Sequence, residues 1–239
     1  MKIKAAIALF AFIFIVKIEC MAQKDSLYRK APNAFFLNPL GLMDLINPSV
    51  QIGYERWLNK QFALQVETGP IIKHSALGYL FEAMDRGAYW YTNKGFKAKA
   101  ELKYTHTKRK MVLGYPVYSV ELFYTDNHSY VNDLFHVVDT TFIYDPPRDT
   151  GYYYYEDFFN LHKQRVGINL KLSGKSFMFH QWYIEPGFGI GVAYRKITHS
   201  DRENPNDEFL DTVLSSHNMD GVRFLPNFTF SLKIGYVFW

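Results

Sequence analysis

Residues Phe224–Trp239 alternate between two kinds of side chain along their whole length. The intervening positions are mostly polar or small, and every second position is apolar, namely Phe224, Pro226, Phe228, Phe230, Leu232, Ile234, Tyr236 and Phe238. Because side chains alternate between faces only in an extended strand, this segment is predicted to be a β-strand with one apolar and one polar face. A strand of this length and aromatic content is typical of a barrel set in a membrane.

The same alternation recurs along the chain and predicts roughly eight strands in total. The other predicted strands are Ala34–Met43, Ser49–Leu58, Gln61–Ile72, Gly95–Thr105, Leu113–Thr125, Leu161–Ser173 and Phe179–Lys196. Tight turns are expected at Asn59-Lys60, Lys108–Lys110 and Gly174-Lys175, and long connections at Lys73–Lys94, Asp126–Asn160 and Thr198–Val222. The predicted fold is all-β, an eight-stranded antiparallel up-and-down transmembrane β-barrel with short periplasmic turns and long extracellular loops.

Length and charge exclude other classes of protein. No apolar run reaches the roughly 18 residues of a membrane helix, whereas a barrel strand needs only about 10 residues of alternating character. The formal net charge of +4 provides no basic stripe of the kind that nucleic-acid binders carry. A chain of 239 residues is long enough for one β domain and short for two.

The N-terminus has the organisation of a secretory signal peptide. A basic start at Lys2 and Lys4 precedes an apolar core at Ala5–Val16 and small residues at Cys20–Ala22. Cleavage after Ala22 would assign residues 1–22 to the signal peptide and residues 23–239 to the barrel domain. The alternative of a membrane anchor fails on length, and lipidation of the one cysteine is disfavoured by the glutamate before it. Export combined with the barrel pattern predicts a bacterial outer-membrane location.

The alternating faces allow two orientations. In a soluble carrier the aromatic face would line a cavity, and in a membrane barrel it would face the acyl chains. The apolar face is too bulky for the interior of eight strands, which side chains just fill. The polar face contains small residues that suit a crowded, tapering interior, including Gly53, Gly167, Gly187, Gly189 and Gly191. We therefore expect the apolar face to point outward.

Charged side chains of the polar face would then be enclosed. An unpaired charge in a narrow lumen is costly, so opposite charges are expected to interleave. The predicted lumen ion-pair network consists of Glu55, Glu67, Lys97, Lys99, Glu101, Lys103, Glu121, Arg165, Lys171, Glu185, Arg195 and Lys233. We expect it to plug the lumen. A proton or ion path through the same residues is the alternative, which the small bore of eight strands disfavours.

Aromatic residues at the strand ends predict the borders of the membrane. From Trp182 to Tyr194, twelve steps of about 3.3 Å tilted near 40° rise roughly 30 Å, which spans an apolar band of about 25 Å and its flanks. Amphipathic rings prefer the two interfaces. The predicted aromatic girdle comprises Trp182, Tyr194, Tyr236 and Phe238.

Several local motifs resemble those of a known group. They are the Ala22-Gln23 junction, Asn38-Pro39-Leu40, Gly53-Tyr54-Glu55-Arg56 before a tight turn, and the ending Lys233-Ile234-Gly235-Tyr236-Val237-Phe238. With these motifs the chain resembles the small outer-membrane β-barrel proteins of Bacteroidota-type bacteria, whose architecture is similar to that of the OmpA and OmpX transmembrane domains. The resemblance implies insertion by the outer-membrane assembly machinery, which reads the aromatic end of the last strand. Phe238 keeps the expected phase, and Trp239 adds one residue out of step.

The expected loops carry the remaining candidate residues. Tyr152, Tyr153, Tyr154 and Tyr155 form a possible loop-binding surface, because tyrosine rings suit contacts with partners. The alternative is a hairpin that extends the strands above the membrane, where the tyrosines meet lipopolysaccharide. The acidic segment Asp201–Asp211 matches no calcium loop. His199-Ser200 and Ser215–His217 are the only pairs suggestive of a lipid hydrolase, and they have neither an acid partner nor a nucleophile turn.

No cofactor and no metal site is predicted, because the spacing of the exposed histidines is not that of metal ligands; they are His74, His106, His128, His136 and His162. The sequence thus predicts an outer-membrane barrel without catalysis, with a structural or adhesin-like role, in contact with outer-membrane lipids and lipopolysaccharide. A lipid-modifying barrel enzyme (a lipid A or phospholipid hydrolase) and a barrel subunit of a secretion or envelope complex are the alternatives. An extracellular ligand or an envelope-complex partner is compatible with the adhesin-like role and with the role as a subunit of a complex.

Overall fold

The computed structural model describes residues 32–43, 48–72, 92–106, 114–136, 154–178, 181–202, 208–209 and 220–238. Most of them belong to β-strands, and a 3-10 helical turn, η3 (Pro39–Met43), follows the first strand. The strands are β1 (Asn33–Asn38), β2 (Gln51–Trp57), β3 (Phe62–Ile71), β4 (Thr92–Thr105), β5 (Tyr115–His136), β6 (Tyr154–Phe177), β7 (Trp182–Ser200), β8 (Glu208–Phe209) and β9 (Gly221–Phe238). Within these ranges no helix has the length and apolar character that crossing a membrane requires. The predicted signal peptide and the turn at Lys108–Lys110 lie outside the described residues.

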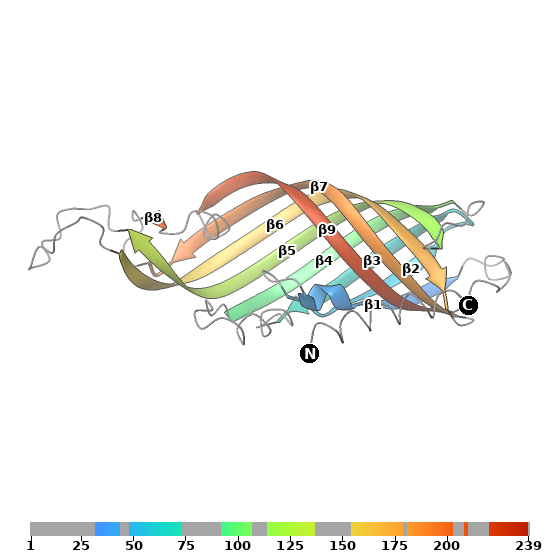
Figure 1. The fold of residues 1–239 in the computed structure, drawn as a ribbon, viewed down its shortest axis with the longest axis horizontal. Helices are drawn as coiled ribbons and strands as arrows, with labels where there is room; N and C mark the ends of the chain where they lie inside the picture. Colours follow the sequence, from blue (N-terminus) through green and yellow to red (C-terminus); the bar gives the residue numbers. More distant parts are fainter. Residues whose placement is uncertain are drawn as a thin grey trace, which may run out of the picture.

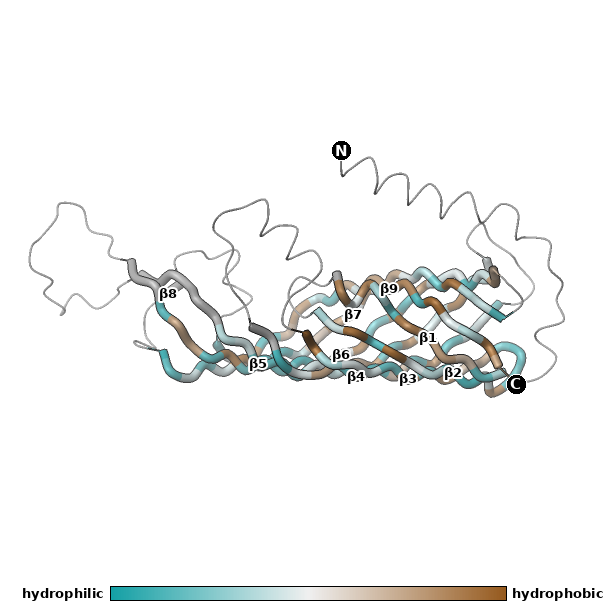
Figure 2. The backbone as a smooth tube through the Cα atoms, turned by 90° about the horizontal axis from the view of Figure 1, so that it is seen from below, coloured by the Kyte–Doolittle hydropathy of each residue, from teal (hydrophilic) through white to brown (hydrophobic). Residues whose placement is uncertain are grey.

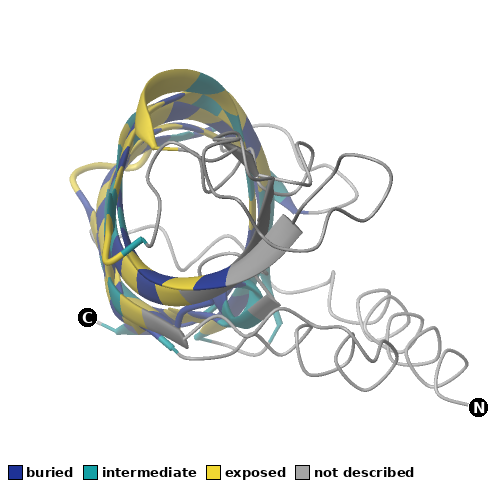
Figure 3. Ribbon diagram, turned by 90° about the vertical axis from the view of Figure 1, so that its left-hand side faces the viewer, coloured by how far each residue is buried: buried dark blue, intermediate teal, exposed yellow. Residues whose placement is uncertain are grey.

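Eight of the strands form a ring-like antiparallel sheet. Along the sheet the order is β4-β3-β2-β1-β9-β7-β6-β5, and the pairing of β4 with β5 closes the ring. Figure 1 shows the strands tilted against the long axis, and Figure 3 shows the ring seen from one end. The two-residue β8 lies outside this order and pairs with β5 at Phe135 and His136. The prediction of eight antiparallel strands in an all-β fold is confirmed.

Strands β5 and β6 are longer than predicted. They pair without interruption from Tyr115↔Lys175 to His136↔Tyr154 and extend past the other strands (left in Figure 1). The long connection predicted from residue 126 to residue 160 is therefore wrong over much of its length. The alternation fades there because both faces of the extension carry polar side chains, such as those of Asp126 and Asn127.

Other boundaries also differ from the prediction, since β4 begins at Thr92, β7 ends at Ser200 and β9 begins at Gly221. The turn predicted at Gly174-Lys175 is wrong, because both residues belong to β6 and pair with the start of β5. The first strand ends early, at Asn38, because Pro39 offers no N–H to the sheet and instead begins η3. The predicted turn at Asn59-Lys60 does join β2 to β3, and its Asn59 Oδ1 accepts hydrogen bonds from the backbone N–H groups of Gln61 and Phe62.

The short β1 leaves a seam in the wall of the ring. Pairing of β1 with β9 stops at Leu37↔Ile234, whereas β9 continues along β7 to Ile197↔Gly221. Among the described residues, no strand pairs with the rest of this edge of β9, and η3 contacts β9 in place of one. The seam therefore lies at the end of the ring from which β5 and β6 extend, which we call the loop side; the opposite end is the turn side.

The inner and outer walls of the ring have opposite character. Figure 2 shows apolar and polar residues alternating along the strands, and Figure 3 shows the matching alternation of exposed and buried residues. Each strand of the ring exposes large apolar side chains, among them Phe35, Ile52, Leu64, Leu102, Leu122, Leu170, Ile190 and Phe230. The interior instead holds fully buried charges such as Glu55, Lys103 and Lys233. The apolar face thus points outward as predicted, and the interior does not fit an apolar-cavity carrier.

Aromatic rings occupy the space that interior glycines leave. The ring of Phe36 lies over Gly53, and the ring of Tyr183 lies over Gly235, so closely that a Cβ at either glycine would overlap the ring. Phe36 and Tyr183 are themselves almost fully buried. These glycines therefore admit large inward-pointing rings to a narrow interior, as the crowding argument predicted.

Candidate functional site

A continuous series of ion pairs crosses the interior of the ring. Acidic residues and lysines alternate along it in the order Glu121, Lys171, Glu101, Lys233, Glu185, Lys103, Glu55 and Lys175. We call this series the ionic chain. Its members come from β2, β4, β5, β6, β7 and β9, so it connects strands all around the ring. Because the charges alternate, the series is electrically balanced.

The distances along the ionic chain are those of direct ion pairs. Lys171 Nζ lies 2.9 Å from a Glu121 oxygen and 3.1 Å from a Glu101 oxygen. Lys233 Nζ lies 2.7 Å from Glu101 and 3.5 Å from Glu185. All of these side chains are at most 1% exposed. At such burial, two-sided pairing is what compensates for the lost hydration of each charge.

The turn-side half of the ionic chain is equally tight. Lys103 Nζ lies 2.7 Å from both Glu55 Oε2 and Glu185 Oε1. Lys175 pairs with Glu55 and lies 3.5 Å from Glu185 Oε2. The Lys175 ammonium also lies 4.3 Å from the centre of the Tyr183 ring, a cation–π arrangement. Lysines and aromatic rings thus fill the interior at the turn side.

Neutral side chains donate further hydrogen bonds to the buried carboxylates. Ser119 Oγ and Gln65 Nε2 donate hydrogen bonds to Glu101, at 2.6 Å and 3.1 Å. Asn169 Nδ2 donates to Glu121 at 2.8 Å, and Ser173 Oγ donates to Glu185 at 3.1 Å. A buried carboxylate needs such donors for the lone pairs that its ion pairs leave unused.

Most of the charged residues predicted in the lumen meet as partners. Beside the ionic chain, Lys99 Nζ lies 3.1 Å from Glu67 Oε1, which also accepts a hydrogen bond from Asn38 at 3.0 Å. Sequence reasoning missed Lys175, because it assigned this residue to a turn instead of to the inward face of β6. Lys175 could have been found from its position, because it lies an even number of residues after Lys171 and so shares the inward face of the strand.

Apart from the Glu67–Lys99 pair, three predicted members lie on the inward face of the ring but outside the ionic chain; they are Lys97, Arg165 and Arg195. Arg165 Nη2 donates to Asn227 Oδ1 at 2.7 Å. Lys97 and Arg165 line a cavity of about 530 Å³, together with Lys99, Asn227 and Leu40 of η3. This cavity lies beside the seam, so the interior has a hollow region towards the loop side and a filled region towards the turn side.

The predicted aromatic girdle lies on the outer wall at two levels. At the turn side, the rings of Trp182 and Tyr236 meet edge to face at 5.3 Å, and Phe238 stacks on Phe35 at 5.1 Å. Twelve residues further along β7, towards the loop side, the ring of Tyr194 meets that of Phe224 at 5.4 Å. Phe96 and Tyr124 form a similar contact at 5.6 Å. Between the two levels the wall is apolar.

Several other candidates from the sequence fall outside the described residues. Neither Tyr152 and Tyr153 nor the segment Ser215–His217 is described, and of the other two tyrosines only the backbone, at the start of β6, is described. His199 packs its ring against Phe159, with centroids 4.9 Å apart. The structure therefore does not test the proposed tyrosine surface or the second hydrolase pair.

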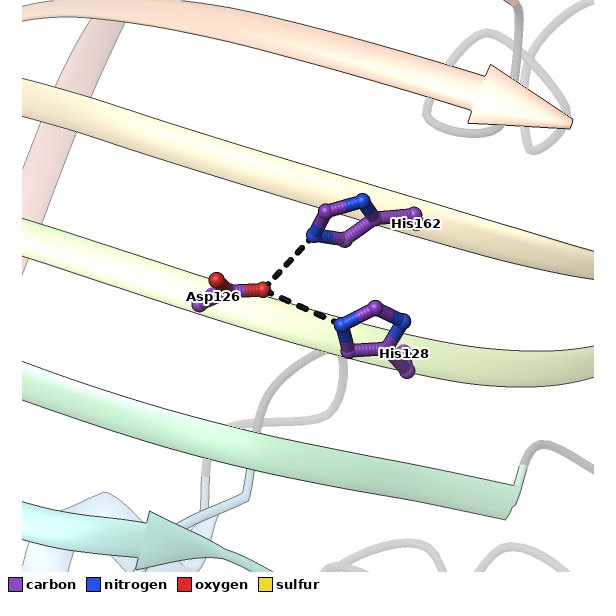
Figure 4. Close-up of side chains that lie close together, drawn as sticks. All are labelled: Asp126, His128 and His162. Atoms are coloured by element: carbon purple, nitrogen blue, oxygen red, sulfur yellow. Dashed lines mark hydrogen bonds and ion pairs between the residues drawn. The ribbon is translucent and has the colours of Figure 1, made fainter.

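A cluster of possible metal ligands is present where the sequence predicted none. Asp126 and His128 of β5 and His162 of β6 lie together on the outer wall (Figure 4), with donor atoms all within 4.8 Å of one another. Asp126 Oδ1 is 2.8 Å from His162 Nε2 and 3.5 Å from His128 Nε2. Linear spacing could not reveal the cluster, because His128 and His162 are cross-strand neighbours whose pairing depends on the register.

Comparisons with known proteins add no relative. No protein-family model, no curated protein and no solved structure matches the chain. What the protein does must therefore be inferred from the outer wall, the ionic chain and the Asp126–His128–His162 cluster themselves.

Proposed function

We propose that this chain is an integral outer-membrane β-barrel protein with a structural or surface-interaction role, that the ionic chain closes its lumen, and that it performs no catalysis. The observation that carries the proposal is that the outer wall is apolar and the inner wall is charged, the reverse of the arrangement in a soluble protein. Apolar side chains are exposed on every strand of the ring while charged side chains are buried inside.

The outer wall supports a lipid environment. Leu170 is 64% exposed, Phe230 is 68% exposed and Ile190 is 52% exposed, and their neighbours on adjacent strands are similar. Monomeric soluble proteins rarely expose a contiguous apolar surface larger than a few hundred Å². A band of this kind, bordered at two levels by Trp, Tyr and Phe rings, matches the hydrocarbon core of a bilayer and its interfaces. Except along the seam beside β9, the ring-like sheet also pairs its backbone groups internally, as lipid requires.

The interior supports a closed lumen. Lys103, Lys175, Lys233, Glu55 and Glu101 are among the largest fully buried side chains of the described residues. Their direct ion pairs span the interior from strand to strand, as expected for the small bore of eight strands. The cavity beside the seam borders this filled region, because Lys99 and Glu121 are among its lining residues.

The extension of β5 and β6 supports a role at the aqueous surface. Beyond the level of Tyr124 and Phe96, polar side chains such as that of His128 lie beside exposed apolar ones such as that of Phe158 on the outer wall. A paired hairpin that leaves the apolar band presents backbone edges and polar groups to the surroundings, which suits contact with lipopolysaccharide or with an extracellular or envelope partner. Insertion would require the outer-membrane assembly machinery.

Fractionation of native cells tests the location. The exported chain should be recovered in the outer-membrane fraction, and the folded form should migrate faster than the boiled form on a gel. Purification of the mature chain as a monodisperse species in buffer without detergent would overturn the proposal. A soluble periplasmic protein expressed in parallel provides the control for leakage between fractions.

Conductance measurements test the closed lumen separately from the location. Folded protein inserted into a planar lipid bilayer should give no steady ion current. A stable current in the wild-type protein would instead support the ion-path alternative. Such a current would contradict the closed lumen but would not affect the proposed membrane location.

A further inference from the structure

We propose that Asp126, His128 and His162 bind a divalent transition-metal ion of the zinc class on the outer wall, at the base of the β5–β6 extension. The ion would receive two imidazole nitrogens and one carboxylate oxygen from the protein and complete its coordination with water. The inference goes beyond the proposed function and depends only on the pairing of β5 with β6.

The register of the two strands brings the ligands together. His128 and His162 are directly opposite each other in the antiparallel pair. Side chains two residues apart in a strand lie on one face, so Asp126 shares the face of His128. Cross-strand partners on one face have Cβ atoms about 4.5–5.5 Å apart. The three side chains therefore surround one point above the sheet, as Figure 4 shows.

The observed distances are close to those of a metal site. With Zn–N and Zn–O bonds of about 2.0–2.2 Å in a tetrahedral site, ligand atoms are roughly 3.3–3.5 Å apart. Asp126 Oδ1 lies 3.5 Å from His128 Nε2 and 2.8 Å from His162 Nε2. The two imidazole rings stack with centroids 3.9 Å apart and planes 11° apart, so each ring must turn to direct its nitrogen at a shared ion. The His128 side chain is 62% exposed and has space to do so.

Neighbouring groups hold the carboxylate in position. Tyr124 Oη donates a hydrogen bond to Asp126 Oδ2 at 3.2 Å, which leaves Oδ1 directed at the two imidazoles. Gln164 Nε2 lies within 3.5 Å of the same Tyr124 hydroxyl. Ligands of metal ions are commonly oriented by such outer hydrogen bonds. Tyr124 and Gln164 are therefore positioning residues for the proposed site.

The ligand set selects the class of metal. Imidazole nitrogen suits Zn²⁺, Ni²⁺ and Cu²⁺, whereas Ca²⁺ and Mg²⁺ prefer sites made of oxygen alone. Lys94 faces His128 across β4 and β5, and Lys196 faces Gln164 across β6 and β7. Both lysines are exposed, so water and salt screen their repulsion of a cation. We therefore expect reversible binding of a transition-metal ion and no binding of alkaline-earth ions.

A bound ion would join β5 to β6 where they leave the ring. The cluster lies just beyond the contact between the aromatic side chains of Phe96 and Tyr124. The β5–β6 extension continues beyond it to His136 and Tyr154. A ligand that binds only the folded form stabilises that form. Occupancy would thus stiffen the base of the extension, as a clamp across the two strands.

Zinc titration of the full mature chain, folded in detergent micelles and free of any histidine tag, tests the inference. Calorimetry with ZnCl₂ should show saturable binding of one equivalent, which EDTA reverses and MgCl₂ does not compete for. His128→Asn and His162→Asn should each weaken binding by at least roughly tenfold, since loss of an outer-shell partner alone has that effect. His106→Asn, a change of the same kind at the turn side, should bind like the wild type.

Two outcomes would overturn the inference. One is the absence of saturable zinc binding by the folded wild-type chain, and the other is unchanged binding in both His128→Asn and His162→Asn. The faster migration of unboiled samples verifies that each variant folds. If a variant does not fold, the wild type still decides the matter, because zinc must raise its unfolding midpoint and EDTA must restore it. The titration gives the same answer whether or not the chain proves to be a membrane protein.

Discussion

Two polar clusters that both include β5 and β6 lie on opposite walls of the ring and differ in almost every physical respect. On the inner wall, Lys171 of β6 lies between Glu121 of β5 and Glu101 of β4, and these side chains are at most 1% exposed. On the outer wall, His128 and His162 share a single carboxylate and are 62% and 34% exposed. The inner cluster is enclosed and saturated, whereas the outer cluster is open.

The difference follows from the solvent that each wall meets. A charge inside the ring has no water to replace a lost partner, so each ion must keep its neighbours. A side chain beyond the apolar band can exchange a protein partner for water at little cost. The inner cluster is therefore suited to hold the ring together, and the outer cluster is suited to exchange ligands.

Removal of one cation from the ionic chain should have the largest effect. Lys171→Met leaves Glu101 and Glu121 buried with one cation fewer, and we expect a loss of about 3–5 kcal/mol in the free energy of unfolding. Urea titration of folded protein, followed by migration of unboiled samples, measures it. Lys60→Met, at the exposed turn, is the matched control. A double variant Lys171→Met/Glu121→Gln should lose less than the sum of the single changes, and strict additivity would contradict direct pairing.

Introduction of a charge on the outer wall should have the next largest effect. Leu170 neighbours Lys171 in sequence but points to the opposite wall and is 64% exposed. In a lipid bilayer, Leu170→Arg should cost about 2–4 kcal/mol, the effect of arginine near the membrane midplane. Leu170→Phe keeps the wall apolar and should remain near the wild type. Tolerance of arginine at this position in vesicles would argue against the membrane proposal.

An added methyl group inside the ring should have an intermediate effect. Gly53→Ala places a Cβ into the ring of Phe36, and overpacking of this kind costs about 1–3 kcal/mol. The same urea titration measures the loss. Phe36→Leu in the same chain should recover part of it, because the smaller side chain leaves space for the Cβ. An equal loss with and without Phe36→Leu would show that the ring is not the cause.

Disruption of the outer cluster without metal should have the smallest effect. His162→Asn removes a partly buried hydrogen bond to Asp126 at the protein surface, and surface changes are usually within about 0.5 kcal/mol. The unfolding midpoint in the presence of EDTA should therefore match that of the wild type. A shift as large as that expected for Lys171→Met would mean that the outer cluster is part of the structural framework instead of a ligand-exchange site.

Part of the interior could be read from the sequence because a strand has a period of two residues. Once one apolar side chain of a strand is known to point outward, every residue an odd number of positions away must point inward. Glu101, Lys103 and Lys233 could therefore be assigned to the interior without coordinates. The extension of β5 and β6 could not be found in this way. Outside the apolar band polar side chains occur on both faces, so the periodic signal weakens although the hydrogen bonds between the strands continue.

The sequence by itself determined the strands, the direction of their faces and the enclosure of both signs of charge, because these depend only on local alternation and on the cost of burying an unpaired ion. The tertiary structure decided which charges meet, that Lys175 belongs among them, and that Asp126, His128 and His162 share one point on the outer wall. These contacts depend on the register between strands, which brings together residues that are far apart along the chain and leaves no spacing in the sequence to detect.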